Sequence, residues 1–135
     1  MGLAERRAVA RFRDEEFPQW QQRIQEAAGF EVPLDVDWDT FAQQGTANYL
    51  GQSLGPVYFE PLTGALAGIT IDDLGREALR DGLTRIVVTN SDRFDGYEGS
   101  TFVDGLLTID ARPAVNVSEV STRRKGLQSL LENAL

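Results

Sequence analysis

Residues 31–39 carry the clearest pattern in the chain, a strict alternation of apolar and polar positions. The apolar set is Val32, Leu34, Val36 and Trp38, and the acidic set is Glu31, Asp35, Asp37 and Asp39. A period of two predicts a half-buried strand, because successive strand side chains point to opposite faces. Pro33 cannot donate a backbone hydrogen bond, so we expect this strand to lie at the edge of a sheet.

Apolar residues at three- and four-residue spacing predict helices over most of the remaining chain. The helical segments are residues 3–28, interrupted by Pro18, then residues 39–83 in two or three pieces, and finally residues 116–134. Within the second segment, Ile71, Leu74, Ala78 and Leu79 form one apolar stripe. Asn116 is the expected N-cap of the last helix, because its side chain can accept from the first turn.

Three further segments read as strands. Residues 84–90 are short and β-branched, which is typical of a buried strand. Residues 100–103 and 106–110 follow, joined by Asp104 and Gly105, which form either a two-residue hairpin turn or a bulge in one long strand. Residues 91–99 between the strands are polar and glycine-rich, and we interpret them as a loop.

Helices and strands are grouped along the chain rather than alternating, which predicts an α+β fold. We expect a small, mostly antiparallel sheet of three or four strands, with helices packed on one face and helices at both the N- and C-termini. Residues 1–135 are expected to form a single domain. Residues 1–17 are a candidate protruding N-terminal helix, because their apolar content is sparse and they carry four arginines.

The chain contains no histidine and no cysteine. It therefore cannot supply a Ser-His-Asp triad, a Cys-His pair, a disulfide or a thiolate or imidazole zinc site. Carboxylate, amine, hydroxyl and backbone groups remain. No motif among them is specific, so we assign no catalytic residue and expect no cofactor.

The formal net charge is −8, from 13 Lys and Arg against 21 Asp and Glu. An acidic surface favours solubility and opposes sequence-independent binding to nucleic acid, which requires many phosphate contacts. No apolar run has the length of a membrane span or a signal peptide. We therefore expect a soluble, cytoplasmic protein that binds neither nucleic acid nor membrane.

Asp35, Asp37 and Asp39 are the first candidate binding residues. Alternate carboxylates of a strand project from one face, about 6.6 Å apart, a spacing compatible with a divalent metal or with acid/base hydrolysis. The simpler interpretation is a solvated outer face, with Asp39 beside a helix N-terminus. The sequence does not decide whether this row binds a metal.

Phe94 and Tyr97 in the 91–99 loop are the second candidate, because exposed aromatic loops often bind partners. The loop does not match a calcium-binding loop: Phe102 stands where the bidentate glutamate belongs. An ordinary hairpin connection is the alternative.

These observations favour a non-catalytic protein-binding or adaptor domain. Its partner would be another protein, with a basic surface that complements the acidic one, or a second copy of the chain. The alternative is a carboxylate-based metal-binding protein or hydrolase that uses Asp35, Asp37 and Asp39.

Overall fold

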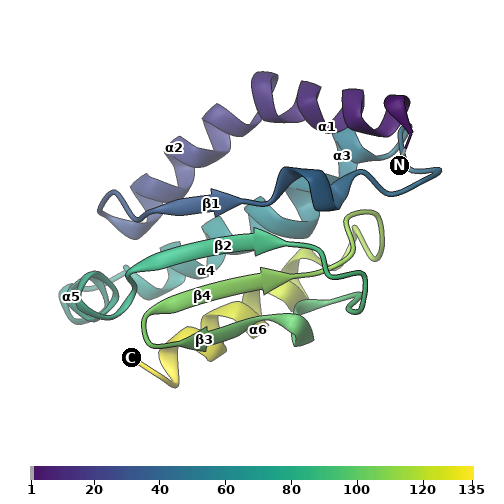
Figure 1. Cartoon of the computed structure of the whole chain (residues 1–135). Helices are drawn as coiled ribbons and strands as arrows, with labels where there is room; N and C mark the ends of the chain where they lie inside the picture. Colours follow the sequence, from purple (N-terminus) through teal and green to yellow (C-terminus); the bar gives the residue numbers. More distant parts are fainter. Residues whose placement is uncertain (1) are drawn as a thin grey trace.

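A four-stranded sheet forms one layer of the protein in the computed structural model, which describes residues 2–135 (Figure 1). The strands are β1 (Leu34–Val36), β2 (Arg85–Thr89), β3 (Thr101–Val103) and β4 (Leu106–Asp110), in the order β1-β2-β4-β3. The first three in this order run parallel, and only β3 is antiparallel to its neighbour β4. The α+β class is thus confirmed, whereas the expectation of a mostly antiparallel sheet is wrong.

The pairing differs from the expectation because alternation identifies a strand but not its neighbour. Residues 37–84 cross over the sheet as helices and return the chain to the end at which β1 began, so β2 runs parallel to β1. Strand β3 then runs back along the outside, and a two-residue turn sends β4 between β3 and β2. Only this last hairpin follows the antiparallel expectation.

In the view of Figure 1, the central and C-terminal helices lie behind the sheet, and the first two helices run along its β1 side. The helices are α1 (Leu3–Glu15), α2 (Phe17–Ala28), α3 (Leu50–Leu54), α4 (Glu60–Ile69), α5 (Asp73–Gly82) and α6 (Val120–Glu132), with short 3₁₀ turns η1 (Trp38–Phe41) and η3 (Tyr97–Gly99) and a π-helical turn η2 (Gly55–Phe59). Helices α4 and α6 pack against each other. None of the helices within residues 2–135 is long and apolar enough to span a bilayer.

The N-terminal helix α1 packs onto the body of the protein and does not protrude. Val9 and Phe12, three residues apart on one face, are both buried. The Phe12 ring stacks on Phe59 with 5.8 Å between ring centroids. Glu5 accepts a hydrogen bond of 3.0 Å from the backbone N–H of Gly45. Two well-placed apolar residues thus hold a helix whose other faces are polar.

Helices α3 and α4 are joined without interruption by the π-helical turn η2. Three consecutive residues of this turn, Val57, Tyr58 and Phe59, are buried. The Tyr58 hydroxyl donates to the backbone carbonyl of Ala111, just beyond β4. Burial raises the pKa of Tyr58 well above its usual value. The wide turn therefore anchors the central helix to the sheet.

The Asp104–Gly105 connection is a two-residue hairpin turn, which settles the alternative left open by the sequence. Both residues have positive φ, +52° and +81°, as a type I′ turn requires. The Gly105 carbonyl accepts from the backbone N–H of Thr84 at 2.8 Å. The hairpin is thereby tied to the start of β2.

Candidate interaction surface

One face of the sheet packs on the helices, and the other has no helix over it (Figure 1). Ile86, Val88 and Leu107 point inward and are buried. Their neighbours along the strands point outward, and the strand register sets them side by side. This outer face comprises Asp35, Arg85, Val87, Thr89, Thr101, Val103, Leu106, Thr108 and Asp110, with Asp37 just beyond β1.

The outer face mixes apolar, hydroxyl and charged side chains: Leu106 stands opposite Arg85, Val87 stands opposite Thr108, and Val103 lies on the edge strand β3. Val87 and Leu106 are half-buried, and Val103 is 62 % exposed. At the β1 side, Arg85 Nε and Asp35 Oδ2 form an ion pair of 2.6 Å in which both side chains are more than half exposed. Such exposed pairs contribute about 1 kcal/mol or less to stability. This pair orders the surface more than it stabilises the fold.

The row of Asp35, Asp37 and Asp39 does not converge on one point. Asp35 is engaged by Arg85, and Asp37 accepts a 3.2 Å hydrogen bond from the Thr89 hydroxyl. Asp39 leaves the row because β1 ends at Val36 and the chain turns into η1. Across residues 2–135, no three acidic side chains come together in a way that could hold a metal ion.

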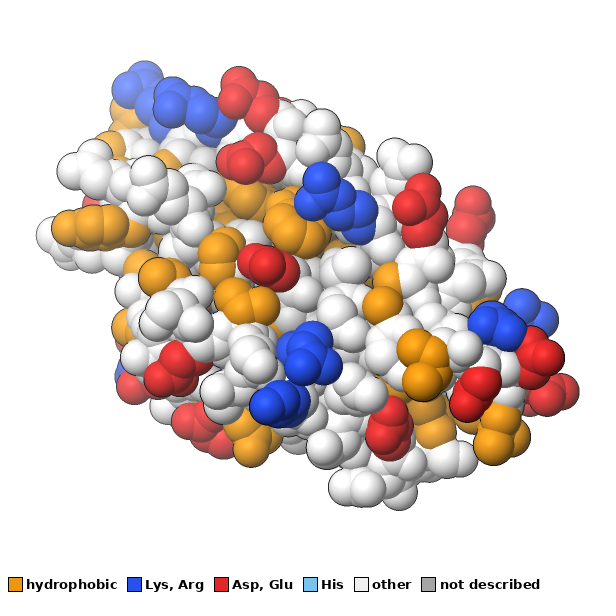
Figure 2. All heavy atoms as spheres, turned by 180° about the vertical axis from the view of Figure 1, so that it is seen from behind, with side chains coloured by type: hydrophobic (Ala, Val, Ile, Leu, Met, Phe, Trp, Pro, Cys, Tyr) orange, Lys and Arg blue, Asp and Glu red, His pale blue; other side chains and the backbone are white. Residues whose placement is uncertain are grey.

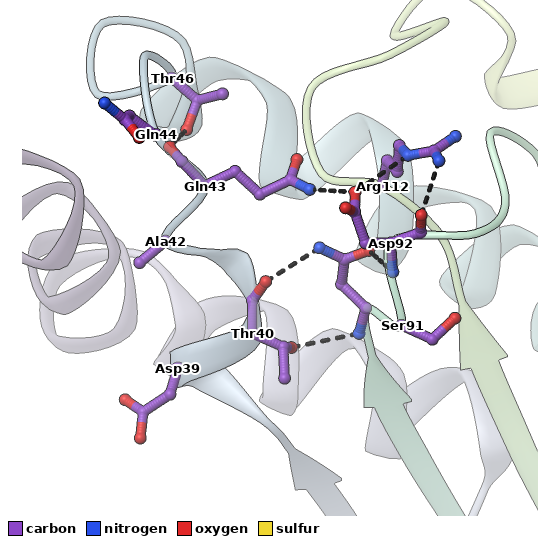
Figure 3. A pocket seen from close by; sticks show the side chains of 10 residues that line it. Asp39, Thr40, Ala42, Gln43, Gln44, Thr46, Ser91, Asp92 and Arg112 are labelled. Atoms are coloured by element: carbon purple, nitrogen blue, oxygen red, sulfur yellow. Dashed lines mark hydrogen bonds and ion pairs between the residues drawn. The ribbon is translucent and has the colours of Figure 1, made fainter. Parts of the chain in front are cut away.

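A shallow cavity of about 560 Å³ opens at the carboxyl ends of the parallel strands (Figure 3). Gln43 points across it toward Asp92, whereas Asp39 points away from that pair. Apart from Ala42, the residues that line the cavity carry polar or charged side chains: Asp39, Thr40, Gln43, Gln44, Thr46, Asn90, Ser91, Asp92 and Arg112. In doubly wound sheets, ligands bind at this edge where the strand order reverses. Here the chain moves in one direction from β1 to β2 to β4, so there is no such crevice.

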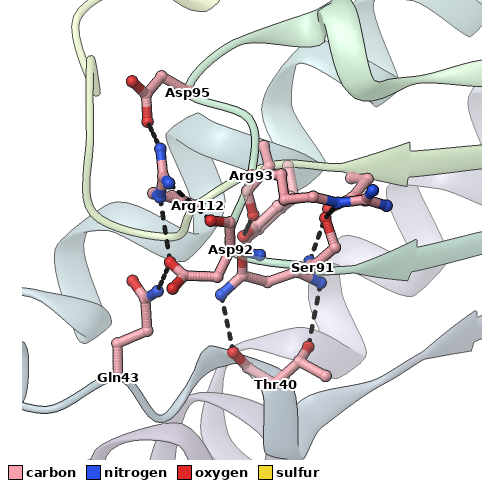
Figure 4. A network of polar contacts seen from close by, with 11 residues as sticks. Thr40, Gln43, Ser91, Asp92, Arg93, Asp95 and Arg112 are labelled. Atoms are coloured by element: carbon pink, nitrogen blue, oxygen red, sulfur yellow. Dashed lines mark hydrogen bonds and ion pairs between the residues drawn. The ribbon is translucent and has the colours of Figure 1, made fainter.

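Arg112 is the centre of a polar network beside this cavity (Figure 4). Its Nε donates to Asp92 Oδ1 at 3.0 Å, its Nη1 to Asp95 Oδ1 at 2.6 Å, and its Nη2 to the Asp92 carbonyl at 2.6 Å. Hydrogen bonds to Asp95 and Asp92 raise the pKa of Arg112. The guanidinium is satisfied within the protein, so the network fixes the loop instead of offering a free cation to a ligand.

Two hydrogen bonds between Asn90 and Thr40 fix the start of the same loop. The backbone N–H of Asn90 donates to Thr40 Oγ1 at 3.1 Å, and its side-chain Nδ2 donates to the Thr40 carbonyl at 2.9 Å. Asn90 Oδ1 in turn accepts from the N–H of Asp92, whose φ is +66°. Aspartate tolerates this left-handed conformation better than most residues. The loop therefore has one defined path.

The two aromatic residues of the loop differ in their environment. Tyr97 is 42 % exposed, and its ring lies against Gly126 of α6, where a side chain would overlap it. Phe94 is half-buried and packs on Gly99, with the Arg93 guanidinium 5.5 Å from its ring centroid. Both rings help to hold the loop on the body, which leaves only part of Tyr97 free to meet a partner.

Arg123 of α6 is a structural residue that the sequence pattern did not reveal. It is 3 % exposed and donates to the backbone carbonyls of Asp95, Val115 and Asn116. Burial lowers its pKa, and its Nε has no hydrogen-bond partner. In the sequence, Arg123 lies in a basic triplet that suggests a solvated face, and a single arginine gives no signal of burial.

The chain matches no family model, no curated protein and no solved structure in comparisons with known proteins.

Proposed function

We propose that this protein is a protein-binding module that presents the outer face of its sheet to a partner. The observation that carries the proposal is the absence of a covering layer on a sheet whose β1, β2 and β4 are parallel. All-parallel sheets are almost always covered on both faces, and three of the four strands of this mixed sheet are parallel. A partner protein can supply the second layer.

The chemistry of the outer face supports a transient partner. Val87, Leu106 and Val103 provide apolar contact area, and threonines and the Asp35–Arg85 pair lie between and around them. Such a mixture of apolar and polar area is typical of non-obligate protein interfaces. A fully apolar face would instead indicate a permanent assembly. The helical side differs, because acidic, basic and hydrophobic side chains are interspersed over it (Figure 2).

The size of the outer face shows that it cannot be the whole interface. Four strands about 4.8 Å apart, of which the two longest have five residues and the two edge strands three, span at most roughly 14 Å by 17 Å, or about 240 Å² in projection. A standard interface covers about 800 Å² on each partner. The partner must therefore also contact the surroundings, and the polar loop at the carboxyl edge and the free edge of β1 adjoin the face directly.

The charge of the chain indicates a basic partner. The net charge is −8, and Asp35 and Asp37 lie at the β1 border of the outer face. Opposite charge accelerates encounter and suppresses wrong partners, and its contribution falls as salt is raised. Binding is expected to weaken as ionic strength rises but not to vanish, because the apolar contacts of Val87, Leu106 and Val103 are insensitive to salt.

Site-specific photo-crosslinking tests this function. A benzophenone side chain is placed at Val87 on the outer face, and at exposed Ala67 on α4 as a control on the helical side. The expected result is one defined adduct from Val87 that is absent from Ala67. The partner protein in the adduct is then identified and produced recombinantly. Its affinity is measured for the unmodified chain and for the Val87→Arg and Ala67→Arg variants. We expect at least a tenfold loss for the former alone; equal effects of the two changes refute the proposal.

A further inference from the structure

The free edge of β1 carries a row of unpaired backbone groups. Pro33 and Asp37 bond to β2, through Ile86 N–H to the Pro33 carbonyl and Asp37 N–H to the Val88 carbonyl, both at 2.8 Å. In a strand, consecutive residues direct their N–H and C=O groups to opposite sides. The N–H and C=O of Leu34 and Val36 therefore point away from the sheet, toward the edge that no strand occupies.

A glutamine side chain already takes the place of a neighbouring strand beside this edge. Gln25 Nε2 donates to the Val32 carbonyl at 2.8 Å, and Gln25 Oε1 accepts from the Val32 N–H at 2.7 Å. Val32 thus exchanges both of its backbone bonds with one amide, as a residue does with its partner in an antiparallel strand. The same geometry continues at Leu34 and Val36, which have no corresponding amide partner on this side among residues 2–135.

Pro33 does not close this edge. Its carbonyl faces β2, so its missing N–H also lies on the β2 side. The sequence correctly predicted an edge strand from Pro33, but the proline leaves the outward row of donors and acceptors intact. The edge is blunted only by its short length.

A groove of about 460 Å³ runs between this edge and α2. Its walls are Pro18, Gln21, Gln22 and Gln25 of α2, and residues 31–34 of the edge. Glu31 is the only charged residue among them. A strand entering here would have one set of alternate side chains in the groove and the other set beside the outward row of Glu31, Asp35 and Asp37.

We propose that this edge binds an extended, basic segment of the partner protein, which adds to the sheet as a fifth strand antiparallel to β1. The proposal rests on the protein-binding function above and names the form of the partner. Unpaired backbone groups select an extended chain. The carboxylates of Glu31, Asp35 and Asp37, against the single Arg85, select alternate Lys or Arg side chains. A second copy is a poor occupant, because β1 against β1 would place two such acidic rows side by side.

A synthetic peptide tests this inference directly. The probe is acetyl-Thr-Lys-Val-Arg-Val-Lys-Thr-amide, whose basic residues share one face of a strand. In antiparallel pairing, its two valines stand opposite Leu34 and Val36 and make the ladder bonds. N-methylation of both valines should therefore weaken binding at least tenfold in fluorescence anisotropy. N-methylation of the three basic residues, whose N–H groups face away, is the matched control and should leave affinity within threefold.

Amide exchange and one charge reversal locate the peptide. Bound peptide should slow exchange of the Leu34 and Val36 amides at least tenfold. Asp37→Lys should weaken binding at least fivefold, while Asp81→Lys, an equal charge change on exposed α5, should have little effect. No binding at millimolar peptide, equal binding of the two N-methylated forms, or protection at β3 instead of β1 overturns the proposal. Crosslinking from Val87 is independent of this assay, so failure at the edge and failure of the outer face are distinguishable.

Discussion

Replacing Arg123 with methionine removes the donor that holds the 91–99 loop on α6. The change keeps an unbranched apolar stem but deletes the guanidinium of a residue that is 3 % exposed. The carbonyls of Asp95, Val115 and Asn116 each lose a hydrogen bond from this group. The loop and the segment before α6 are thereby released together.

The expected cost follows from these three bonds. A hydrogen bond to a charged group contributes about 1.5–3 kcal/mol, and an orphaned buried acceptor costs about 1–3 kcal/mol. Water can reach part of this site once the loop moves, and the methionine no longer carries the desolvation cost of a buried charge. We therefore expect Arg123→Met to lower the free energy of unfolding by about 2–4 kcal/mol, a large part of the 5–15 kcal/mol typical of a domain.

Urea unfolding measures this loss, with Arg80→Met as the control. Arg80 is exposed on α5, so the same substitution there should change stability by less than about 0.5 kcal/mol. Native-state amide exchange adds a local measurement: residues 91–99 should exchange faster in Arg123→Met but not in the control. If the two variants unfold at the same urea concentration, the bracing role assigned to Arg123 is wrong.

Three other changes have equally definite expectations. Gly126→Ala presses a methyl group against the Tyr97 ring, so it should destabilise the protein by about 1 kcal/mol. In a Tyr97→Ala background the same change should stabilise the protein by up to about 1 kcal/mol, because alanine favours the helix more than glycine does. Urea unfolding of the unmodified chain, the two single variants and the double variant checks both signs. Gly75→Ala drives a Cβ into a backbone carbonyl of the preceding turn and should cost about 3 kcal/mol or more, seen as a lower Tm; an unchanged Tm would contradict this. The Gly45 N–H lowers the pKa of Glu5 below 4.5, so the Glu5 carboxylate stabilises the fold fully above that pH, and this stabilisation is lost as the pH falls through the lower pKa of the folded state. Glu5→Gln should flatten this part of the acid-unfolding curve, and an unchanged curve would count against the contact.

The sequence predicted the elements better than their partners. Alternation identified β1, β-branched residues identified β2, and Asp104–Gly105 marked a turn that the structure shows to be a hairpin. Strand direction was missed, because parallel and antiparallel neighbours impose the same alternation on a short strand. The extent of β1 was overestimated for a related reason: Trp38 continues the period of two, but it lies in η1 within a cluster of aromatic rings.

Helix periodicity also did not tell which stripe is covered. The spacing of Ile71, Leu74, Ala78 and Leu79 predicted a helix, and α5 forms there. Only Leu79 of this set is buried, while Ile71 and Leu74 are 78 % and 77 % exposed. At the C-terminal helix, Asn116 lies outside α6 with a φ of +50° and does not cap it. Local pattern reports on conformation, whereas coverage depends on elements distant in the sequence.

At the candidate site too, local patterns were predictable from the sequence and long-range contacts were not. The sequence indicated the acidic row and the aromatic loop, but it gave no sign that Arg85 pairs with Asp35 or that Arg112 joins Asp92 to Asp95. These contacts join residues 17 to 50 positions apart. Isolated arginines have no periodicity from which such a contact can be inferred.

The π-helical turn at Gly55–Phe59 sets the rotational phase between the two halves of the central helix. Each residue of an α-helix advances the chain by 100°. The π-turn takes up one residue more than an α-helix would for the same rotation, so winding these same residues as an uninterrupted α-helix from Leu50 to Ile69 would rotate everything after the turn by about that angle. Leu62 and Leu66 would then swing away from the interior they now fill. The same chain with a more regular helix would therefore be a less stable protein, since its local geometry and its hydrophobic core would no longer agree.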